Sequence, residues 1–473
     1  MKRALFTASI IVLLGCSAPS QASDPLETQT DASDELALTI YGDGRALIED
    51  NRRIRFSGGE EVVALPGVSS AILPQSVTVK ADGMTIIEQN FDFDLLTPQK
   101  LMEKAVGQYV EIVKTNPATG EEYRETAKVL SVNNGVVIQV GDQIEVLRDD
   151  NIPTRVIFPK VPDNLRASPT LSLRVDARSG SRDANMTYIS SGISWRADYV
   201  AVFNEDDKRM NLQGWATIDN TTNTTFHDAE LSVVAGQVGN AQPRNQYNNY
   251  NRNVNQGQRS GGMEAGSAER IGDNYLYPLP GTTSLASKQK KQISFVDASN
   301  VKAEKVYEYY NWNFQTIEQP ANVDSRIAFS NSKAGGMGEA LPAGTVRVYA
   351  EDKKGKAQFI GEDLIGHITA GSDISMKIGE AFDITVQPTL VKSTDISRRV
   401  RDYEMKYEVR NASGKEVSVN IYQSVYGRYY DFQMLKESDD HVRKNDDTLK
   451  WTIDVPAEGE AVLTFKIRQT SKW

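Results

Sequence analysis

The sequence has a single cysteine, Cys16, and three histidines among its 473 residues. Because no thiol lies after position 16, disulfide bonds, thiolate catalysis and Cys-ligated metal sites are excluded from the rest of the chain. Three histidines leave little material for imidazole chemistry. A folded region of this composition must be held together by packing alone.

Long apolar runs and basic runs are also missing. No stretch after residue 16 approaches the roughly 18 consecutive apolar residues of a membrane-spanning helix. The formal net charge is −10, and no dense basic segment is present to bind phosphates, so we expect no nucleic-acid partner. The nucleophile-elbow, phosphate-loop and zinc His-Glu-x-x-His motifs are absent as well. These absences predict a protein that is not an enzyme and has no catalytic residues, bound metal or cofactor.

The N-terminus has the pattern of an export signal. Lys2 and Arg3 precede an apolar run at 4–14 that is too short to span a bilayer. A Leu-Leu-Gly-Cys motif ends at Cys16 and resembles a bacterial lipobox, which implies lipidation of Cys16. The alternative is ordinary signal-peptide cleavage after Ala22.

The residue after the lipobox bears on the destination of the chain. Ser17, rather than an acidic residue, follows Cys16. Under the lipobox interpretation this implies an outer-membrane lipoprotein that faces the periplasm or the cell surface. Under the alternative the protein is soluble in the periplasm. In both cases we expect an exported protein, and in the first its membrane contact is the lipid anchor.

Apolar alternation is clearest between residues 192 and 236. Three runs, 195–203, 210–218 and 229–235, alternate apolar and polar residues with the period of half-buried strands. Their polar connectors have the length of hairpin loops. This pattern predicts an antiparallel meander of three strands.

Similar strand patterns continue along most of the chain, punctuated by Gly, Pro and Asn. One short helix is expected at 97–106, where Thr97 can cap and Pro98 fits the first turn. The five short runs that follow suggest a small SH3-like or Sm-like barrel. The overall prediction is an all-β, multi-domain β-sandwich protein with that inserted barrel and an immunoglobulin-like C-terminal domain. The expected segments are a signal peptide (1–22), a tether (23–35), an N-terminal β module (36–96), the helix and barrel (97–160), a central β-sandwich (161–300) with a disordered loop (239–272), and a C-terminal β-sandwich (301–473).

Several phrases resemble one bacterial family. They are GISWRADY at 192–199, DNT at 219–221, DAELSVVAG at 228–236, LPAGTVRVY at 341–349 and FIGED at 359–363. In this order they resemble the family called domain of unknown function 4139, from about Gly192 to the C-terminus. That family includes the mucoidy-inhibitor-A-like envelope proteins. Its name gives no activity and no catalytic residues to transfer.

The chain departs from that group in one respect. The mucoidy-inhibitor proteins carry a long coiled coil between their N-terminal strands and this domain. Here no sustained heptads occur, and the short helix and small barrel stand in that place. The role of the coiled coil therefore does not carry over.

The three histidines have no catalytic setting in the sequence. His227 precedes Asp228, but adjacent strand residues point to opposite faces. His367 is expected to be a half-buried strand residue. His441 lies in an acidic segment that ends at Asp447, where calcium is one interpretation, but the EF-hand spacing is absent and a solvated hairpin loop is favoured.

Aromatic residues give the only candidate contact surfaces. Four tryptophans, Trp195, Trp215, Trp312 and Trp451, would form a sugar-stacking platform if exposed, although core packing is favoured for those in alternating strands. A denser aromatic string lies near the C-terminus. We predict it to be a protein interface if it is exposed: Tyr422, Tyr426, Arg428, Tyr429, Tyr430 and Phe432.

These observations favour a non-enzymatic cell-envelope protein. The first hypothesis is binding or scaffolding by contact with another envelope protein. The alternative is binding of carbohydrate or exopolysaccharide, and a hydrolase is the least favoured class because no His, carboxylate and Ser are brought together by any motif.

Overall fold

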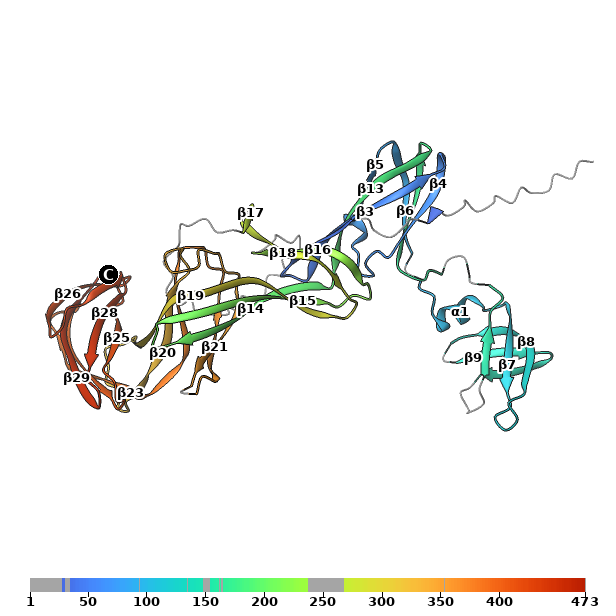
Figure 1. Cartoon of the computed structure of the whole chain (residues 1–473). Coiled ribbons are helices and arrows are strands. Elements are labelled where there is room, and N and C mark those ends of the chain that lie inside the picture. Colours follow the sequence, from blue (N-terminus) through green and yellow to red (C-terminus); the bar gives the residue numbers. More distant parts are fainter. Residues whose placement is uncertain are drawn as a thin grey trace, which may run out of the picture. The chain divides into compact units, whose positions relative to one another are not determined.

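The computed structural model of the chain describes residues 28–29, 35–92, 94–133, 135–147, 154–160, 162, 165–236, 268–352 and 354–472. Within these residues the fold is all-β with one α-helix, as expected (Figure 1). The predicted signal peptide with Cys16, most of the tether and nearly all of the loop at 239–272 lie outside the described residues.

The chain divides into two compact units that are not consecutive in sequence. The first comprises Met1–Glu35, Asp50–Ser70 and Val77–Met186, and the second comprises Leu36–Glu49, Ala71–Ser76 and Thr187–Trp473. Boundaries between the units fall inside three strands, β2 (Glu35–Tyr41), β3 (Arg45–Phe56) and β13 (Gly180–Ser191), and at both ends of the segment Ala71–Ser76. The consecutive division expected from the sequence stays a prediction.

The first unit contains a four-stranded sheet in the order β1-β4-β12-β6. The central strand, β12, is antiparallel to both neighbours. Its apolar residues Leu171, Leu173 and Val175 are fully buried and alternate with polar residues, which is the pattern of a strand with one apolar face. Strand β5 (Thr78–Ala81) lies beside β13. The bounds of the four strands are Thr28–Gln29 (β1), Gly59–Pro66 (β4), Met84–Asp92 (β6) and Thr170–Ala177 (β12).

The predicted helix and five short strands are confirmed in the same unit. The helix α1 is Pro98–Lys104, and the Thr97 side chain accepts a hydrogen bond from the Lys100 N–H, which is the capping interaction expected from the sequence. The five strands form one antiparallel sheet in which the last strand pairs with the first. Its order is β10-β9-β8-β7-β11, with bounds Tyr109–Thr115 (β7), Glu122–Ser131 (β8), Val136–Val140 (β9), Gln143–Leu147 (β10) and Thr154–Ile157 (β11). Met102 and Ala105 pack against its core.

The second unit begins with a sandwich of two sheets. Tyr199, Phe295 and Tyr277 pack edge to face between the sheets, with centroids 5.9 and 5.7 Å apart. The Trp195 Nε1–H donates to the Val234 carbonyl across the same layer, at 3.0 Å. One sheet has the order β22-β21-β14-β15-β19, with bounds Ala357–Ile365, Gly344–Glu351, Ile193–Asn204, Arg209–Asn220 and Lys290–Asn311. The other has the order β17-β18-β16-β2-β3, with Glu269–Ile271, Asn274–Leu285, Phe226–Ala235 and Glu35–Tyr41 before β3.

The predicted three-stranded meander is wrong in its last strand. Strands β14 and β15 form the expected hairpin, but β16 pairs with β18 and β2 in the opposite sheet. Asn220, at the start of this crossing, is fully buried and is hydrogen-bonded to the connector. Its Nδ2 donates to the carbonyls of Thr224 (2.9 Å) and Ala286 (3.0 Å), and its Oδ1 accepts from the N–H (3.0 Å) and hydroxyl (2.7 Å) of Thr222.

A second sandwich forms the C-terminal part of the unit. One sheet has the order β20-β23-β24-β29-β26, and β19 continues into the facing strands β25, β28 and β27. Both sheets contribute to one core, whose largest residues include Trp451, Tyr407 and Phe465. The bounds are Ala321–Ser330 (β20), Asp373–Asp395 (β23), Val400–Asn411 (β24), Val417–Ser424 (β25), Tyr430–Glu437 (β26), Val442–Asn445 (β27), Thr448–Val455 (β28) and Gly459–Ser471 (β29).

Candidate functional site

The predicted aromatic string is divided between the core and the surface. Tyr422 on β25 is buried, with 3% exposure. The Tyr426 hydroxyl donates to Asn313 Oδ1 in the loop after β19. Tyr429 and Tyr430 are exposed, by 54% and 37%. The surface part of the string is therefore smaller than the sequence set, and its role as an interface stays a prediction.

The remaining members of the string lie beside an edge strand. Phe432 on β26 packs partly against the core, and the Arg443 guanidinium lies 5.0 Å from its ring centroid. Arg428 is exposed, and its backbone N–H donates to Asp447. Strand β26 is the last strand in its sheet, so one backbone edge faces away from the sheet.

Only one of the four tryptophans considered above is largely exposed. Trp195 and Trp451 are buried and Trp215 is half-buried, as expected for core residues, whereas Trp312 is 65% exposed. Trp312 directly follows β19 and stacks on Tyr310, with ring centroids 6.1 Å apart. A platform of four tryptophans is thus excluded, and one exposed indole remains.

The histidines do not form a catalytic cluster. His227 is exposed, and its neighbour Asp228 has φ 48°. His367 is exposed outside the strands, contrary to expectation, and its Nδ1 accepts the Ala343 N–H at 3.2 Å. His441 Nδ1 lies 2.8 Å from a Glu437 carboxylate oxygen. Among the described residues, no group of three His, Cys, Asp or Glu is placed to hold a metal ion.

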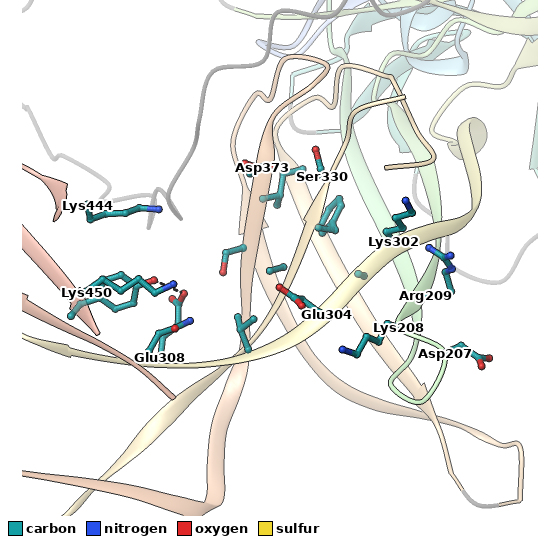
Figure 2. Close-up of a pocket in the computed structure, with 18 residues that line it drawn as sticks. Asp207, Lys208, Arg209, Lys302, Glu304, Glu308, Ser330, Asp373, Lys444 and Lys450 are labelled. Carbon is teal, nitrogen blue, oxygen red and sulfur yellow. Dashed lines mark hydrogen bonds between the residues drawn. The ribbon is translucent and has the colours of Figure 1, made fainter. Parts of the chain in front are cut away.

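A cleft of about 610 Å³ opens between the two sandwiches of the second unit (Figure 2). Its long wall is β19, where Lys302, Glu304 and Glu308 lie on one face because they are spaced by even numbers of residues. Figure 2 shows Lys444 and Lys450, from β27 and β28, on the opposite side from Lys302. The hairpin turn between β14 and β15, with the first residue of β15, completes the rim with Asp207, Lys208 and Arg209.

The five cations of this cleft have no side-chain partner among the described residues. Within the part of the chain that the structure describes, none of their side chains makes an ion pair or hydrogen bond: Lys208, Arg209, Lys302, Lys444 and Lys450. Nearby lysines outside the cleft are paired, as in Lys305–Glu205 (3.4 Å) and Lys377–Asp324 (2.6 Å). Other cations that are unpaired within the described part of the chain, such as Lys356 and Lys392, lie elsewhere on the surface, so what distinguishes the cleft is that five such cations gather around one hollow.

The carboxylates of the cleft do not cancel this charge. Glu308 is neutralised by Arg326, whose Nε lies 3.2 Å away. Asp207, Glu304 and Asp373 remain, so five cations face three carboxylates. The cleft thus has a local excess of two positive charges in a chain with a net charge of −10.

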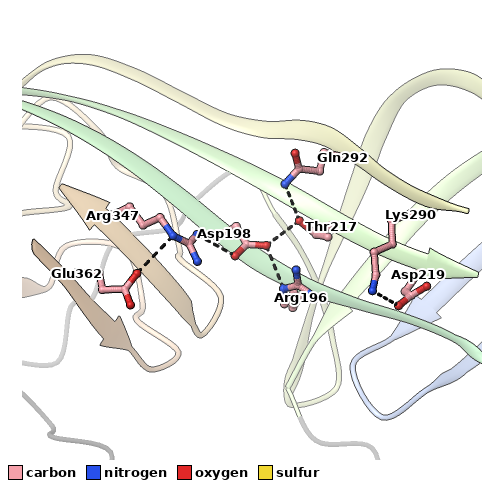
Figure 3. A network of polar contacts seen from close by, with 8 residues as sticks. All are labelled: Arg196, Asp198, Thr217, Asp219, Lys290, Gln292, Arg347 and Glu362. Atoms are coloured by element: carbon pink, nitrogen blue, oxygen red, sulfur yellow. Dashed lines mark hydrogen bonds and ion pairs between the residues drawn. The ribbon is translucent and has the colours of Figure 1, made fainter. Parts of the chain in front are cut away.

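A second polar network lies on the first sandwich (Figure 3). Asp198 on β14 is buried and accepts hydrogen bonds from the Thr217 hydroxyl (2.6 Å), Arg196 (3.1 Å) and Arg347 (3.3 Å). Arg347 also pairs with Glu362 at 3.3 Å. The network thereby connects β14 with β15, β21 and β22. Every charged member has a partner, so it stabilises the sheet and leaves no group free for chemistry.

The pKa of Asp198 follows from this setting. Burial raises the pKa, but the hydrogen bonds from Thr217 and Arg347 and the charge of Arg196 outweigh it, so the pKa is lowered. Asp198 is therefore ionised in the fold and does not act as a proton donor near neutral pH.

Three of the phrases that resemble the family meet in one corner of this sandwich. Trp195, Arg196, Val234 and Pro342 line a cleft of about 480 Å³ together with His367. Its polar groups are already engaged, because Trp195 donates to Val234 and His367 accepts from a backbone N–H. The residues of these three phrases therefore lie where the two sheets of the sandwich meet.

The sequence reasoning missed the cationic cleft. Its cations come from segments near positions 208, 302, 444 and 450. No run of basic residues in the sequence at these positions predicts a cationic site. The even spacing of charged residues along 302–308 was the only local signal, and it is also typical of a solvated strand face.

Comparison with known proteins agrees with the resemblance seen in the sequence. The family described as Domain of unknown function (DUF4139) matches residues 184–470, which is more than half of the chain. No curated protein matches the sequence. The described residues contain no helix that is both long enough and apolar enough to cross a membrane. With the match spanning both sandwiches of the second unit, the chain belongs to the DUF4139 family.

Proposed function

We propose that this chain is a non-enzymatic cell-envelope protein whose second unit binds an anionic ligand in the cleft between its two sandwiches. The observation that carries the proposal is the gathering of five unpaired cations around one cleft in a chain of net charge −10. Long-range charge repels anions from most of such a surface, so a local excess of cations favours one binding site. The envelope location rests on the lipobox-like segment that ends at Cys16.

A binding experiment tests this proposal by removing two positive charges from the side of the cleft formed by β27 and β28. Full-length protein is titrated with labelled poly-L-glutamate, polyphosphate and polygalacturonate, and compared with the Lys444→Gln/Lys450→Gln variant. Two contacts at about 0.5–1 kcal/mol each predict a roughly 5- to 30-fold loss of affinity. The loss should shrink as salt is added, because Lys444 is exposed and Lys450 only half-buried.

A matched variant separates the cleft from the general surface. Lys356 and Lys392 are exposed, lie outside the cleft and make no ion pair within the described residues. Lys356→Gln/Lys392→Gln removes the same charge and should bind like the unmodified protein. Equal losses in the two double variants, or no binding of any of the three polymers, would contradict the proposal.

A protein partner at β26 is the second candidate. The edge position of β26 and the exposure of Tyr429 and Tyr430 favour it, since open strand edges with aromatic residues are suited to pairing with another chain. Purification from detergent-solubilised membranes, with Tyr429→Ala/Tyr430→Ala as the comparison, tests it. A stoichiometric partner that the variant fails to retain is the expected result, and equal retention would count against the edge.

A further inference from the structure

A column of three aromatic rings continues the wall of the cleft. Tyr422, which lines the cleft, stacks on Tyr310 with centroids 4.4 Å apart and planes at 6°. Trp312 also stacks on Tyr310, with centroids 6.1 Å apart and planes at 17°. The column therefore runs from the cleft to the exposed Trp312 indole.

Hydrogen bonds to Glu308 hold the two tyrosines of the column in place. Both tyrosine hydroxyls donate to the Glu308 carboxylate at 3.1 Å, and Arg326 neutralises that carboxylate. Burial, followed by the charge of Glu308, raises the pKa of both phenols above its ordinary value. The two phenol rings therefore stay neutral and are held in place, and Trp312 stacks on one of these ordered rings.

The cleft and the column form one linear surface on β19. Residues 302, 304, 306 and 308 line the cleft, and Tyr310 and Trp312 follow at the same even spacing, as their ring contacts confirm. Ten residues of strand span about 33 Å. A surface of this length is suited to an extended polymer rather than to a small ion.

The mixture of groups specifies the chemistry of the polymer. The unpaired cations require negative charge, whereas Glu304, which has no partner among the described residues, and Asn420 offer acceptors to hydroxyl donors. Polyphosphate has no such donors. Single-stranded nucleic acid needs several open rings and a denser positive charge, while here Trp312 is the one ring of the column that is largely exposed.

We propose that the ligand is an acidic polysaccharide, a chain with both hydroxyl and carboxylate groups, that stacks one sugar ring on Trp312 and places its carboxylates among the cleft lysines. This inference rests on the proposed anion-binding function. Stacking uses the apolar face of the sugar, carboxylates accept from Lys450 and Lys444, and hydroxyls donate to Glu304. Each group of the surface then has a partner of matching chemistry.

The experiment separates sugar recognition from charge. Full-length protein is titrated with polygalacturonate, with its methyl ester, which has the same backbone without the charge, and with poly-L-glutamate and oligo-dT, which have charge without sugar. We expect polygalacturonate to bind at least about tenfold more tightly than the other three. Trp312→Ala should weaken it about fivefold or more, and Trp312→Phe should restore most of the affinity.

The controls make the outcomes distinct. Tyr109→Ala removes an aromatic ring of similar exposure outside both the column and the β26 edge and should leave polygalacturonate binding unchanged. Because Trp312 is exposed, far-ultraviolet circular dichroism should confirm that Trp312→Ala is folded. Suppose that poly-L-glutamate or oligo-dT binds as tightly as polygalacturonate and that the Trp312 substitutions do not change the affinity. The proposal of an anion-binding cleft is then retained, and the proposal of an acidic polysaccharide is overturned. If no polymer depends on Lys444 and Lys450, both proposals are overturned.

Discussion

Substitution of Asn220 tests how much buried hydrogen bonds contribute to the free energy of unfolding of this fold. It ends β15 with 0% exposure and directs the chain into the opposite sheet. In Asn220→Ala, the carbonyls of Thr224 and Ala286 lose a donor and the Thr222 N–H loses its acceptor. Each orphaned buried group costs about 1–3 kcal/mol. The Thr222 hydroxyl also lies 3.3 Å from the Thr224 carbonyl and relieves part of the loss, so we expect about 3 kcal/mol for the three groups together.

Asn220→Asp distinguishes hydrogen bonding from side-chain volume. A carboxylate at this position faces two carbonyl oxygens, so it is held away from ionisation and its pKa is raised. A raised acid pKa gives stability that is present below the unfolded value of about 4 and is lost as the pH rises above it. The aspartate variant should therefore be least stable near neutral pH, while the alanine variant shows no such dependence.

Urea unfolding followed by tryptophan fluorescence is the assay. All five tryptophans lie at or after residue 195, so the signal reports on the second unit alone. Asn322 is exposed on β20, and Asn322→Ala should change the unfolding free energy by less than about 0.5 kcal/mol. If Asn220→Ala costs no more than Asn322→Ala, the assignment of the strand crossing to this side chain is wrong.

Three further predictions concern other parts of the chain. The buried Tyr407 hydroxyl donates to Gln423 and accepts from Asn311, so Tyr407→Phe should cost about 2–3 kcal/mol in the same unfolding assay; an unchanged midpoint would show that the pair of bonds contributes nothing. Asp198→Asn should destabilise the protein by about 1–2 kcal/mol at pH 7. The pKa of Asp198 is lowered from 3.8, so the difference in unfolding free energy between wild type and Asp198→Asn should shrink as the pH falls below 3.8. A difference that does not change with pH would contradict a stabilising role for the charge of Asp198. Cys16→Ser should move the protein from the membrane fraction to the soluble fraction, whereas a wild type that is already soluble would favour cleavage after Ala22.

Local patterns in the sequence predicted most of the elements. The cap at Thr97, the alternation along 195–203 and 210–218, and the turn residues between them place α1, β14 and β15 correctly, because these signals depend on neighbours within a few residues. The family phrases also lie in the sequence itself, and the DUF4139 match agrees with them. The absence of thiols after Cys16 is equally a property of composition.

Tertiary structure decided which strands pair and which charges meet. The connector after Asn220 resembles a hairpin loop in sequence, but the buried amide binds carbonyls from residue 286, more than sixty positions away, and sends β16 into the other sheet. Lys302, Lys444 and Lys450 are likewise separated in sequence and meet only because β25 connects β19 with β28 and β27 in the sheet. The net charge of −10 follows from composition alone. The excess of positive charge at the cleft depends on which distant segments the fold brings together, so composition did not indicate it.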